Sequence, residues 1–338
     1  MIEFKYISKK FEQQWEELVK NSGSSGFMQS CFWCDFKRKT GWETFKIGLF
    51  EDGKLIGGTV AMKFHYSKTK NFLYLPEGPI LPYGSPNADK YFDELIGEID
   101  AVADLKGDEL TTHLRIEPRL SEVPIFFRKF DKAPYNMEPR HTLMLDLSQS
   151  EKEILAQMKQ KGRYNIKIAD KNNVEVIEDP SEAGIKKFIK LYKETTDRKK
   201  FEGKSDKYFY ALVDALQKNK TGTLYIAQSK NIPLAAAIVI FYGDRSTYFF
   251  GATSNKDREK MAPYKLHFEI AKASKAKNFK WYDFWGIAPA DADQSHDWYG
   301  FTQFKKKFGG KSFRFIGAYD FVYNKKLYLE FLKESGEI

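Results

Sequence analysis

Residues 45–62 read FKIGLFEDGKLIGGTVAM, with two apolar runs joined by the polar segment EDGK at residues 51–54. Apolar runs on either side of an Asp-Gly turn predict a β-hairpin. Downstream, residues 72–75 predict another strand, about 88–105 a helix, and 110–116 a further strand. This part of the chain therefore predicts antiparallel strands followed by a helix and one more strand.

The same order recurs in the second half of the chain. Its predicted elements are strands at 223–228, 234–241 and 246–250, a helix at 264–276 and a strand at 281–285. An amphipathic helix precedes the first strand of each copy, at 11–19 and at 182–194. Helix, antiparallel strands, helix, strand is the core of an N-acyltransferase-like (GNAT-like) fold. The sequence thus predicts an α/β (α+β) protein with two tandem GNAT-like domains. No stretch keeps a heptad pattern, so no coiled-coil arm is expected.

The composition points to an anionic partner. The 338 residues carry a formal charge of +9 and a pI near 9.1, which suits RNA, a nucleotide or a membrane surface without choosing among them. No apolar run is long enough to span a bilayer, and the first residues lack the apolar segment of a signal peptide. A cytoplasmic location is expected. Residues 151–171 form a Lys- and Arg-rich segment, for which a solvated helix face and an RNA-facing surface are weighed equally.

Familiar catalytic motifs and metal-ligand spacings are missing from the sequence. Cys31 and Cys34 form a CxxC without a second ligand pair, which favours two packed thiols, and the histidines show no metal-like spacing. Neither a metal nor a cofactor is therefore predicted. Acetyltransferases hold the pyrophosphate of CoA on a glycine-rich turn at a helix N-terminus. Here the equivalent segments are Lys260-Met-Ala-Pro-Tyr and Asn87-Ala-Asp, which lack consecutive glycines, and Pro263 has no N–H. The expected acyl donor is not CoA.

Seven segments in order along the chain resemble the FemABX family of aminoacyl-tRNA-dependent transferases, which build peptidoglycan cross-bridges. They are Gln29-Ser-Cys-Phe-Trp with Lys37 and Gly41-Trp42, Tyr74-Leu-Pro-Glu-Gly-Pro, Lys161-Gly-Arg-Tyr-Asn-Ile-Lys, Thr195-Thr-Asp-Arg, Ala262-Pro-Tyr-Lys-Leu, Tyr282-Asp-Phe-Trp-Gly-Ile, and Gly300-Phe-Thr-Gln-Phe-Lys-Lys-Lys-Phe-Gly-Gly. Without an arm, the chain resembles the compact FemX type in particular.

The resemblance implies a domain division and partners. The C-terminal strand and helix would return to complete domain 1, at 1–147 plus 318–338, for precursor binding. Domain 2, at 148–317, would hold the transfer site and face tRNA. The implied donor is aminoacyl-tRNA, and the acceptor is the stem-peptide amine of UDP-MurNAc-pentapeptide or lipid II. A peripheral contact with the inner face of the membrane and a monomeric state are further expectations.

The resemblance also implies site residues. Phe304 and Lys305 would be catalytic, with Lys305 stabilising the tetrahedral oxyanion or the tRNA terminus and Phe304 shaping the site. Lys37 and Arg198 would grip the nucleotide diphosphate.

Substrate-contacting tyrosines are expected near Gly251, where this chain has Phe250 in place of a tyrosine. Tyr248 or Tyr264 would then supply the missing hydroxyl.

Two alternatives stay open: a GNAT-like transferase acting on another amine, and a non-catalytic basic RNA-binding protein. No residue stands out as a general base, although Glu117 and Asp283 lie at the ends of predicted strands.

Overall fold

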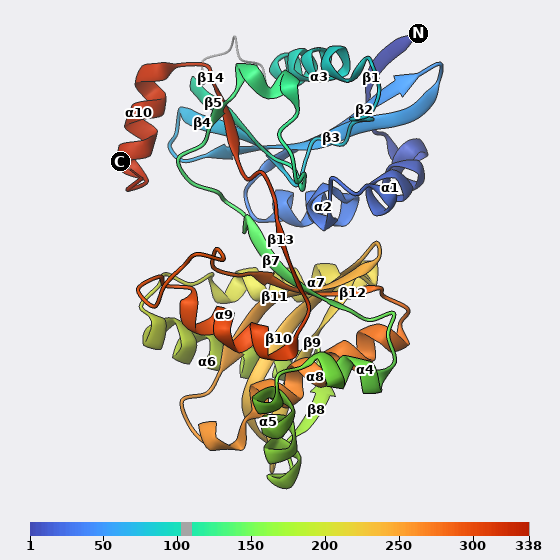
Figure 1. Ribbon diagram of the computed structural model, residues 1–338. Helices are drawn as coiled ribbons and strands as arrows, with labels where there is room; N and C mark the ends of the chain where they lie inside the picture. Colours follow the sequence, from blue (N-terminus) through green and yellow to red (C-terminus); the bar gives the residue numbers. More distant parts are fainter. Residues whose placement is uncertain (103–109, 338) are drawn as a thin grey trace. The chain divides into compact units, whose positions relative to one another are not determined.

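The computed structural model describes residues 1–102 and 110–337, which form two compact units (Figure 1). Unit 1 consists of Met1–Arg140 and Arg314–Ile338, and unit 2 of His141–Phe313. These divisions precede those expected from the sequence, at 147/148 and 317/318. For the first division the reason is hydrogen bonding, because the strand at 141–146 pairs with the sheet of unit 2.

Unit 1 contains a mixed sheet with strand order β1-β2-β3-β4-β5-β14-β6. Its strands are β1 (Ile2–Tyr6), β2 (Glu43–Glu51), β3 (Lys54–His65), β4 (Lys70–Pro76), β5 (Leu110–Glu117), β6 (Asp131–Lys132) and β14 (Tyr319–Val322). Its helices are α1 (Glu12–Asn21), α2 (Cys31–Lys39), α3 (Ala88–Val102) and α10 (Lys325–Glu334). The 45–62 hairpin is present as β2 and β3, and β4 and β5 are parallel. Part of the helix expected at 88–105 lies outside the described residues.

Unit 2 repeats this layout, with strand order β13-β7-β12-β11-β10-β9-β8. Its strands are β7 (His141–Asp146), β8 (Glu175–Glu178), β9 (Gly222–Ser229), β10 (Ile232–Tyr242), β11 (Arg245–Thr253), β12 (Trp281–Gly286) and β13 (Lys311–Arg314). Its helices are α4 (Glu151–Gln157), α5 (Gln160–Lys171), α6 (Glu182–Lys199), α7 (Asp206–Asn219), α8 (Ala262–Ala276) and α9 (Tyr299–Lys305). Here β11 and β12 form the parallel pair. Among the described residues the longest helix is α6, with 18 residues. The described part of the chain therefore contains no coiled-coil arm.

The basic segment at 151–171 forms two helices rather than one. Ser150 caps α4 with a capping box that includes Glu153, and Met158 then adopts extended backbone before α5 begins. Ile154, Met158 and Ile166 are buried, while Ile168 is only half-buried.

Two of the segments that resemble the FemABX family stabilise the structure of unit 1. Gln29 is fully buried, and its side-chain amide donates to Pro76 O at 2.6 Å while its amide oxygen accepts from Val60 N at 2.6 Å. Glu77 is also buried, accepts from Met28 N at 3.0 Å and pairs with Arg119 at 3.0 Å. A buried polar group is tolerated when it is bonded in this way. These motifs hold the start of α2 against β3 and the end of β4.

Candidate functional site

The parallel strands of unit 2 separate part-way along their length. The pairing of β11 with β12 runs from Arg245–Trp281 to Thr247–Asp283, although β11 continues to Thr253 and β12 to Gly286. Each strand is irregular just beyond this point, with register shifts opposite Ile238/Val239 in β11 and between Asp283 and Gly286 in β12. Irregularities of this kind bend strands and re-aim side chains. The ends of the two strands therefore leave room for other groups.

The irregularity in β11 decides which aromatic residue faces this opening. Tyr248 is paired with Val239 and Phe250 with the adjacent Ile238, so Phe249 is an extra residue. Because neighbouring residues of β10 face opposite ways, Tyr248 and Phe250 lie on opposite faces of the sheet although they are two residues apart.

The two side chains consequently have different surroundings. Phe250 packs on Tyr192, Tyr208 and Phe209, which belong to α6 and α7. Tyr248 packs on His267 of α8, with ring centroids 4.5 Å apart, and its hydroxyl lies so close over Gly251 that a Cβ there would be 1.5 Å away. Gly251 is required for this placement. Tyr248, and not Phe250, belongs to the group around Lys305.

Lys305 is a buried cation at the end of α9, with 7% of the residue exposed. Its Nζ donates to the carbonyl oxygen of Gly286 at 2.7 Å, and it lies 4.8 Å from the ring centroid of Phe301 and 5.6 Å from that of Tyr248. Burial lowers the pKa of Lys305 to about 7, while the charge of Asp283 acts in the opposite direction. The amine thus combines low exposure, aromatic walls and a proton that it can lose near neutral pH.

Phe304 and Tyr264 line the neighbouring part of this group. Their ring centroids are 5.0 Å apart, and Phe304 lies 5.4 Å from the ring of His267. The Tyr264 hydroxyl accepts from Lys307 Nζ at 3.0 Å. His267 Nδ1 is 2.7 Å from the hydroxyl of Tyr282, and burial, together with the nearby Lys305, lowers the pKa of His267 to about 3. His267 is therefore neutral over the physiological range.

Four of the expected site residues, Lys305, Phe304, Tyr248 and Tyr264, are thus brought together in unit 2. Two important neighbours, His267 and Asp283, were not expected in this role from the sequence. The spacing of the histidines points to no role for His267, and the position of Asp283 at the end of a predicted strand suggests only a candidate general base. The one available signal was the position of Asp283 inside the family-like segment Tyr282-Asp-Phe-Trp-Gly-Ile.

Arg198 lies apart from this group, near the end of α6. Its guanidinium donates to Thr253 Oγ1 at 2.8 Å and also to Asn255, so it is tied to the end of β11 rather than held in an exposed turn. Burial and the neighbouring Arg258 lower its pKa. Two guanidinium groups close together would suit a phosphate ligand.

Lys37 belongs to unit 1, where it is half-buried near the end of α2. Its ammonium lies 4.2 Å from the ring centroid of Trp42. A cation–π contact of this kind fixes the side chain.

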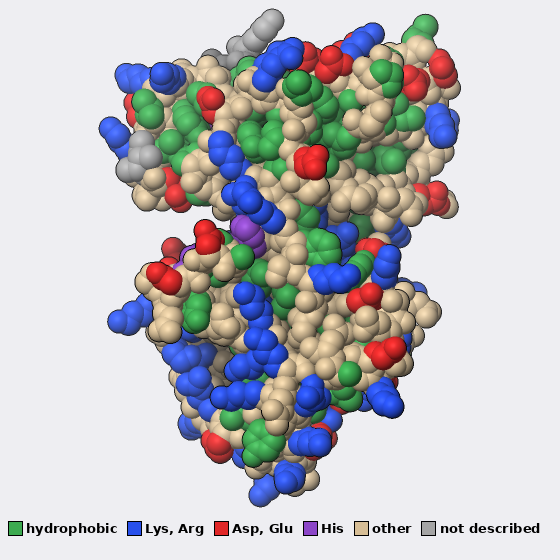
Figure 2. Space-filling view, viewed as in Figure 1, with side chains coloured by type: hydrophobic (Ala, Val, Ile, Leu, Met, Phe, Trp, Pro, Cys, Tyr) green, Lys and Arg blue, Asp and Glu red, His purple; other side chains and the backbone are tan. Residues whose placement is uncertain are grey.

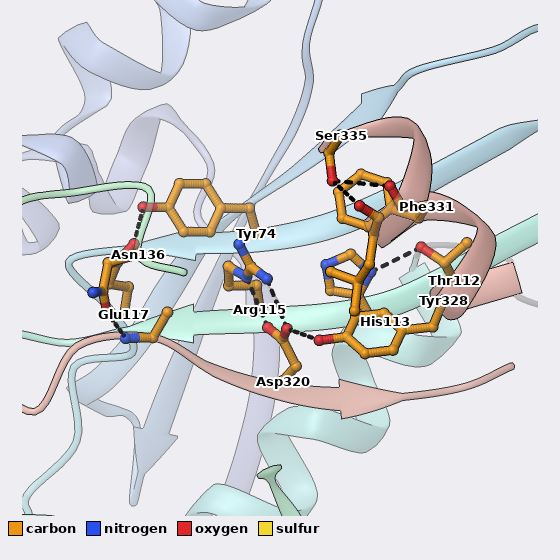
Figure 3. A network of polar contacts seen from close by, with 12 residues as sticks. Tyr74, Thr112, His113, Arg115, Glu117, Asn136, Asp320, Tyr328, Phe331 and Ser335 are labelled. Atoms are coloured by element: carbon orange, nitrogen blue, oxygen red, sulfur yellow. Dashed lines mark hydrogen bonds and ion pairs between the residues drawn. The ribbon is translucent and has the colours of Figure 1, made fainter. Parts of the chain in front are cut away.

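The equivalent parallel pair in unit 1 is filled by its own side chains (Figure 3). Strands β4 and β5 pair as far as Pro76–Glu117, which are their last residues. The Tyr74 hydroxyl donates to Glu117 at 2.7 Å, and burial raises the pKa of Glu117 to about 7. Next to it, Arg115 and Asp320 form a fully buried bidentate ion pair with bonds of 2.8 and 2.7 Å.

Positive charge gathers on one face of unit 2. Lys and Arg side chains follow the region of α9 and α5 in the space-filling view (Figure 2). The start of α5 adjoins the turn at Lys306–Phe308, because Lys159 N donates to Lys307 O at 3.0 Å. The exposed or half-buried cations of this surface are Lys159, Lys161, Arg163, Lys167, Lys171, Lys306 and Lys307. Lys306 and Lys307 of this basic surface directly follow Lys305 in the chain.

Within residues 1–102 and 110–337, no cluster of His, Cys, Asp and Glu could hold a metal ion. Over the same described ranges, the helices are all too short or too polar to cross a bilayer. Cys31 and Cys34 are free thiols, and burial raises the pKa of both.

A model of the FemAB family matches residues 11–98, 126–229 and 217–332. The chain belongs to the FemAB family. Its relatives include the lipid II:glycine glycyltransferases of Staphylococcus epidermidis (23% identical, over 94% of this chain and 92% of the relative) and of Staphylococcus aureus (22% identical, with the same coverage). The alignment with the S. epidermidis protein spans 392 positions, more than this chain has residues. That FemAB relative therefore carries residues without a counterpart here.

Solved structures agree with this family assignment at the level of the fold. A crystal structure of FemX superposes with a TM-score of 0.84 at 20% identity, over 97% of this chain and 99% of FemX. A tandem GNAT protein from the clavulanic acid biosynthesis pathway superposes with a TM-score of 0.59 at 10% identity, over 95% and 98%. The prediction of a FemABX-type chain with two tandem GNAT-like domains is confirmed.

Proposed function

We propose that this FemAB protein is an aminoacyltransferase that moves an amino acid from aminoacyl-tRNA to the stem-peptide amine of a peptidoglycan precursor. The observation that carries the proposal is the buried amine of Lys305, which lies where the parallel strands of unit 2 separate, between the rings of Phe301 and Tyr248. The relatives named as lipid II:glycine glycyltransferases support the class of acceptor.

The proposed reaction forms a negatively charged intermediate, which a positively charged group can stabilise. The acceptor nitrogen bonds to the carbonyl carbon of the aminoacyl ester, and a tetrahedral oxyanion forms. The bond from that carbon to the ribose oxygen of tRNA then breaks, and the proton of the amine ends on that oxygen. A protonated Lys305 in a site with little water would stabilise the oxyanion, since charges interact strongly where the dielectric is low.

The start of α8 supports a donor other than CoA. The helix begins at Ala262 after Met261, which has a left-handed backbone, and Pro263 occupies the first turn. Pro263 supplies no N–H, and Tyr264 N already donates to Met261 O at 3.0 Å. A pyrophosphate would thus meet few free donors at this helix end.

The basic surface of α5 and the Lys306–Phe308 turn supports tRNA as the donor. It carries lysines in succession with the exposed ring of Tyr164, which is 62% exposed. Lysines interleaved with an aromatic ring suit the phosphates and bases of RNA. Precursor binding would fall to unit 1, where Lys37 would contact the diphosphate. In unit 2, Arg198 would contact a phosphate group.

An assay of several labelled aminoacyl-tRNAs tests this function, with UDP-MurNAc-pentapeptide and lipid II as alternative acceptors and mass spectrometry of the products. We expect one acceptor to gain the mass of one aminoacyl residue, and the product to disappear when tRNA is first digested with RNase. Transfer that survives RNase, or transfer from an acyl-CoA, would contradict the proposal. Binding of tRNA without any product would favour a non-catalytic RNA-binding protein.

A further inference from the structure

The amine of Lys305 is oriented by the backbone carbonyl of Gly286, which accepts its hydrogen bond at 2.7 Å. The direction of this carbonyl depends on the preceding residue, Trp285. Trp285 has a φ of 61°, in the left-handed region that residues with a side chain seldom adopt. Such a conformation persists only when surrounding contacts impose it.

One such contact comes from Asp283. The Asp283 carboxylate is completely buried, and its Oδ1 accepts the N–H of Trp285 at 2.8 Å and the hydroxyl of Thr142. Asp283 pairs with Met144 and Gly286 pairs with Thr142, so Phe284 and Trp285 stand opposite a single residue of β7. The carboxylate therefore accepts one hydrogen bond from within the bulge and one from the neighbouring strand β7.

We propose that Asp283 is a positioning residue for Lys305: it holds the bulge at Trp285 so that the Gly286 carbonyl meets the amine, and it supplies a buried negative charge that acts on that amine. The inference rests on the proposed function only in assigning Lys305 to the transfer step. It accounts for three members of the Tyr282-Asp-Phe-Trp-Gly-Ile segment, namely the acid, the residue in left-handed backbone and the glycine whose carbonyl is used.

The aromatic rings around the amine are uncharged, so the charge of Asp283 has a strong effect on the pKa of Lys305. Phe301 and Tyr248 present ring faces to Lys305, and the His267 ring in the same group is neutral because burial lowers its pKa to about 3. The negative charge of Asp283 acts on Lys305 against the effect of burial. Removing the charge of Asp283 will therefore disfavour the protonated amine and lower the pKa of Lys305 further.

Titration of the free protein tests the charge without any substrate. Lysine labelled with ¹³C at Cε would be followed by NMR in wild type and in Asp283→Asn, with Lys305→Met used to assign the signal. We expect the Lys305 midpoint to fall by at least one pH unit in Asp283→Asn. Asp170→Asn is the matched control, since Asp170 pairs with a different lysine of unit 2, Lys265, at 2.7 Å. An unchanged midpoint in Asp283→Asn overturns the electrostatic part.

A double-mutant cycle with Trp285→Gly tests the backbone part, because glycine adopts the left-handed conformation without help. In the wild-type background we expect Asp283→Asn to lower kcat at least tenfold, with KM for either substrate changed less than twofold. In the Trp285→Gly background the same change should cost at least threefold less. Equal losses in the two backgrounds would overturn the positioning role, as would a loss confined to KM.

A second variant covers the case in which Asp283→Asn does not fold. Thr142→Val removes the hydroxyl that donates to Asp283 but keeps the charge of Asp283. We therefore expect kcat to fall several-fold, while the titration midpoint of Lys305 falls by less than half a pH unit. An unaffected kcat would overturn the positioning role. If wild type transfers no amino acid at all, the proposed function fails, whereas the NMR titration still decides whether Asp283 acts on Lys305.

Discussion

The parallel strand pairs of the two units have the same place in the sheet, but one stays paired to its end and the other separates part-way. In unit 1, β4 and β5 pair to their last residues, and Glu117 at the end is bonded to Tyr74. In unit 2, β11 and β12 stop pairing at Thr247–Asp283, and Lys305 occupies the region beyond.

Burial drives the two titratable groups towards the same pKa from opposite sides. It raises the pKa of Glu117 to about 7 and lowers that of Lys305 to about 7. In both cases the buried environment penalises the charged form. A duplicated fold can therefore keep one parallel pair as closed core and open the other for chemistry, with little change in topology.

The largest effect is expected from breaking the buried ion pair of unit 1, which lies beside the closed end of β4 and β5. Arg115→Met leaves Asp320 buried without its ion-pair partner, which should lower the free energy of unfolding by about 3–5 kcal/mol. Urea unfolding monitored in unit 1 would measure this. Lys90→Met, which removes the exposed pair with Glu94, is the control and should change it by about 1 kcal/mol or less. Similar losses in the two variants would contradict the distinction.

Removing the lysine at the open end of β11 and β12 should lower turnover strongly while the protein stays folded. Lys305→Met removes the charge proposed to stabilise the oxyanion, so kcat should fall by about 10²–10³, the usual cost of losing such a group. Precursor affinity, measured by calorimetry, should be nearly unchanged. Lys275→Met is a matched control, because Lys275 also donates to a backbone carbonyl of unit 2, that of Leu147, at 2.8 Å. Unchanged turnover in Lys305→Met would remove its catalytic role.

The pH dependence of stability should separate the two buried groups by sign. The folded-state pKa of Glu117 is raised from 4.5 to about 7, so its contribution to stability is full below 4.5 and is lost as the pH rises through 7. The pKa of Lys305 is lowered from 10.5 to about 7, so its contribution is full above 10.5 and is lost as the pH falls through 7.

Each group therefore gives a slope of at most about 1.4 kcal/mol per pH unit, downward between 4.5 and 7 for Glu117 and upward between 7 and 10.5 for Lys305. Glu117→Gln should remove only the first slope and Lys305→Met only the second, as measured by urea unfolding across these ranges. If either variant changed the slope in the other range, the assignment would be wrong.

The smallest effect is expected at Phe250. Phe250→Tyr adds a hydroxyl on the α6 and α7 side of the sheet, so kcat/KM should change less than twofold. Tyr248→Phe removes a hydroxyl on the Lys305 side and should lower kcat/KM by about tenfold, within the range of a hydrogen bond to a reacting group. A large gain in Phe250→Tyr would show that the face assignment is irrelevant to acceptor binding.

The sequence pattern was enough to predict most of the strands, because the hairpins of both units are apolar runs joined by Asp-Gly or Lys-Asn turns. It missed α7, and it did not predict the short edge strands β8 and β13, whose side chains are half-exposed and carry little pattern. The family resemblance supplied Lys305, Phe304, Tyr248 and Tyr264, which the structure does bring together.

Other features of the site depend on contacts that no local pattern encodes. The opposite facing of Tyr248 and Phe250 follows from one extra residue in β11, which is visible only in its register with β10. The link from Asp283 to Lys305 passes through the left-handed backbone of Trp285, a residue type that gives no sign of such a conformation. The importance of Gly251 likewise appears only when the Tyr248 hydroxyl is seen against it.

The return of the chain to unit 1 has a consequence for biosynthesis. Unit 2 is one continuous segment, so it can fold as soon as its residues leave the ribosome. Unit 1 must wait, since β14 inserts between β5 and β6, and Asp320, which neutralises Arg115, is made only after the whole of unit 2. The nascent half-domain therefore keeps an unneutralised guanidinium until β14 has been made. A prematurely ended chain would carry a folded unit 2 beside a unit 1 that chaperones and proteases can recognise as unfinished.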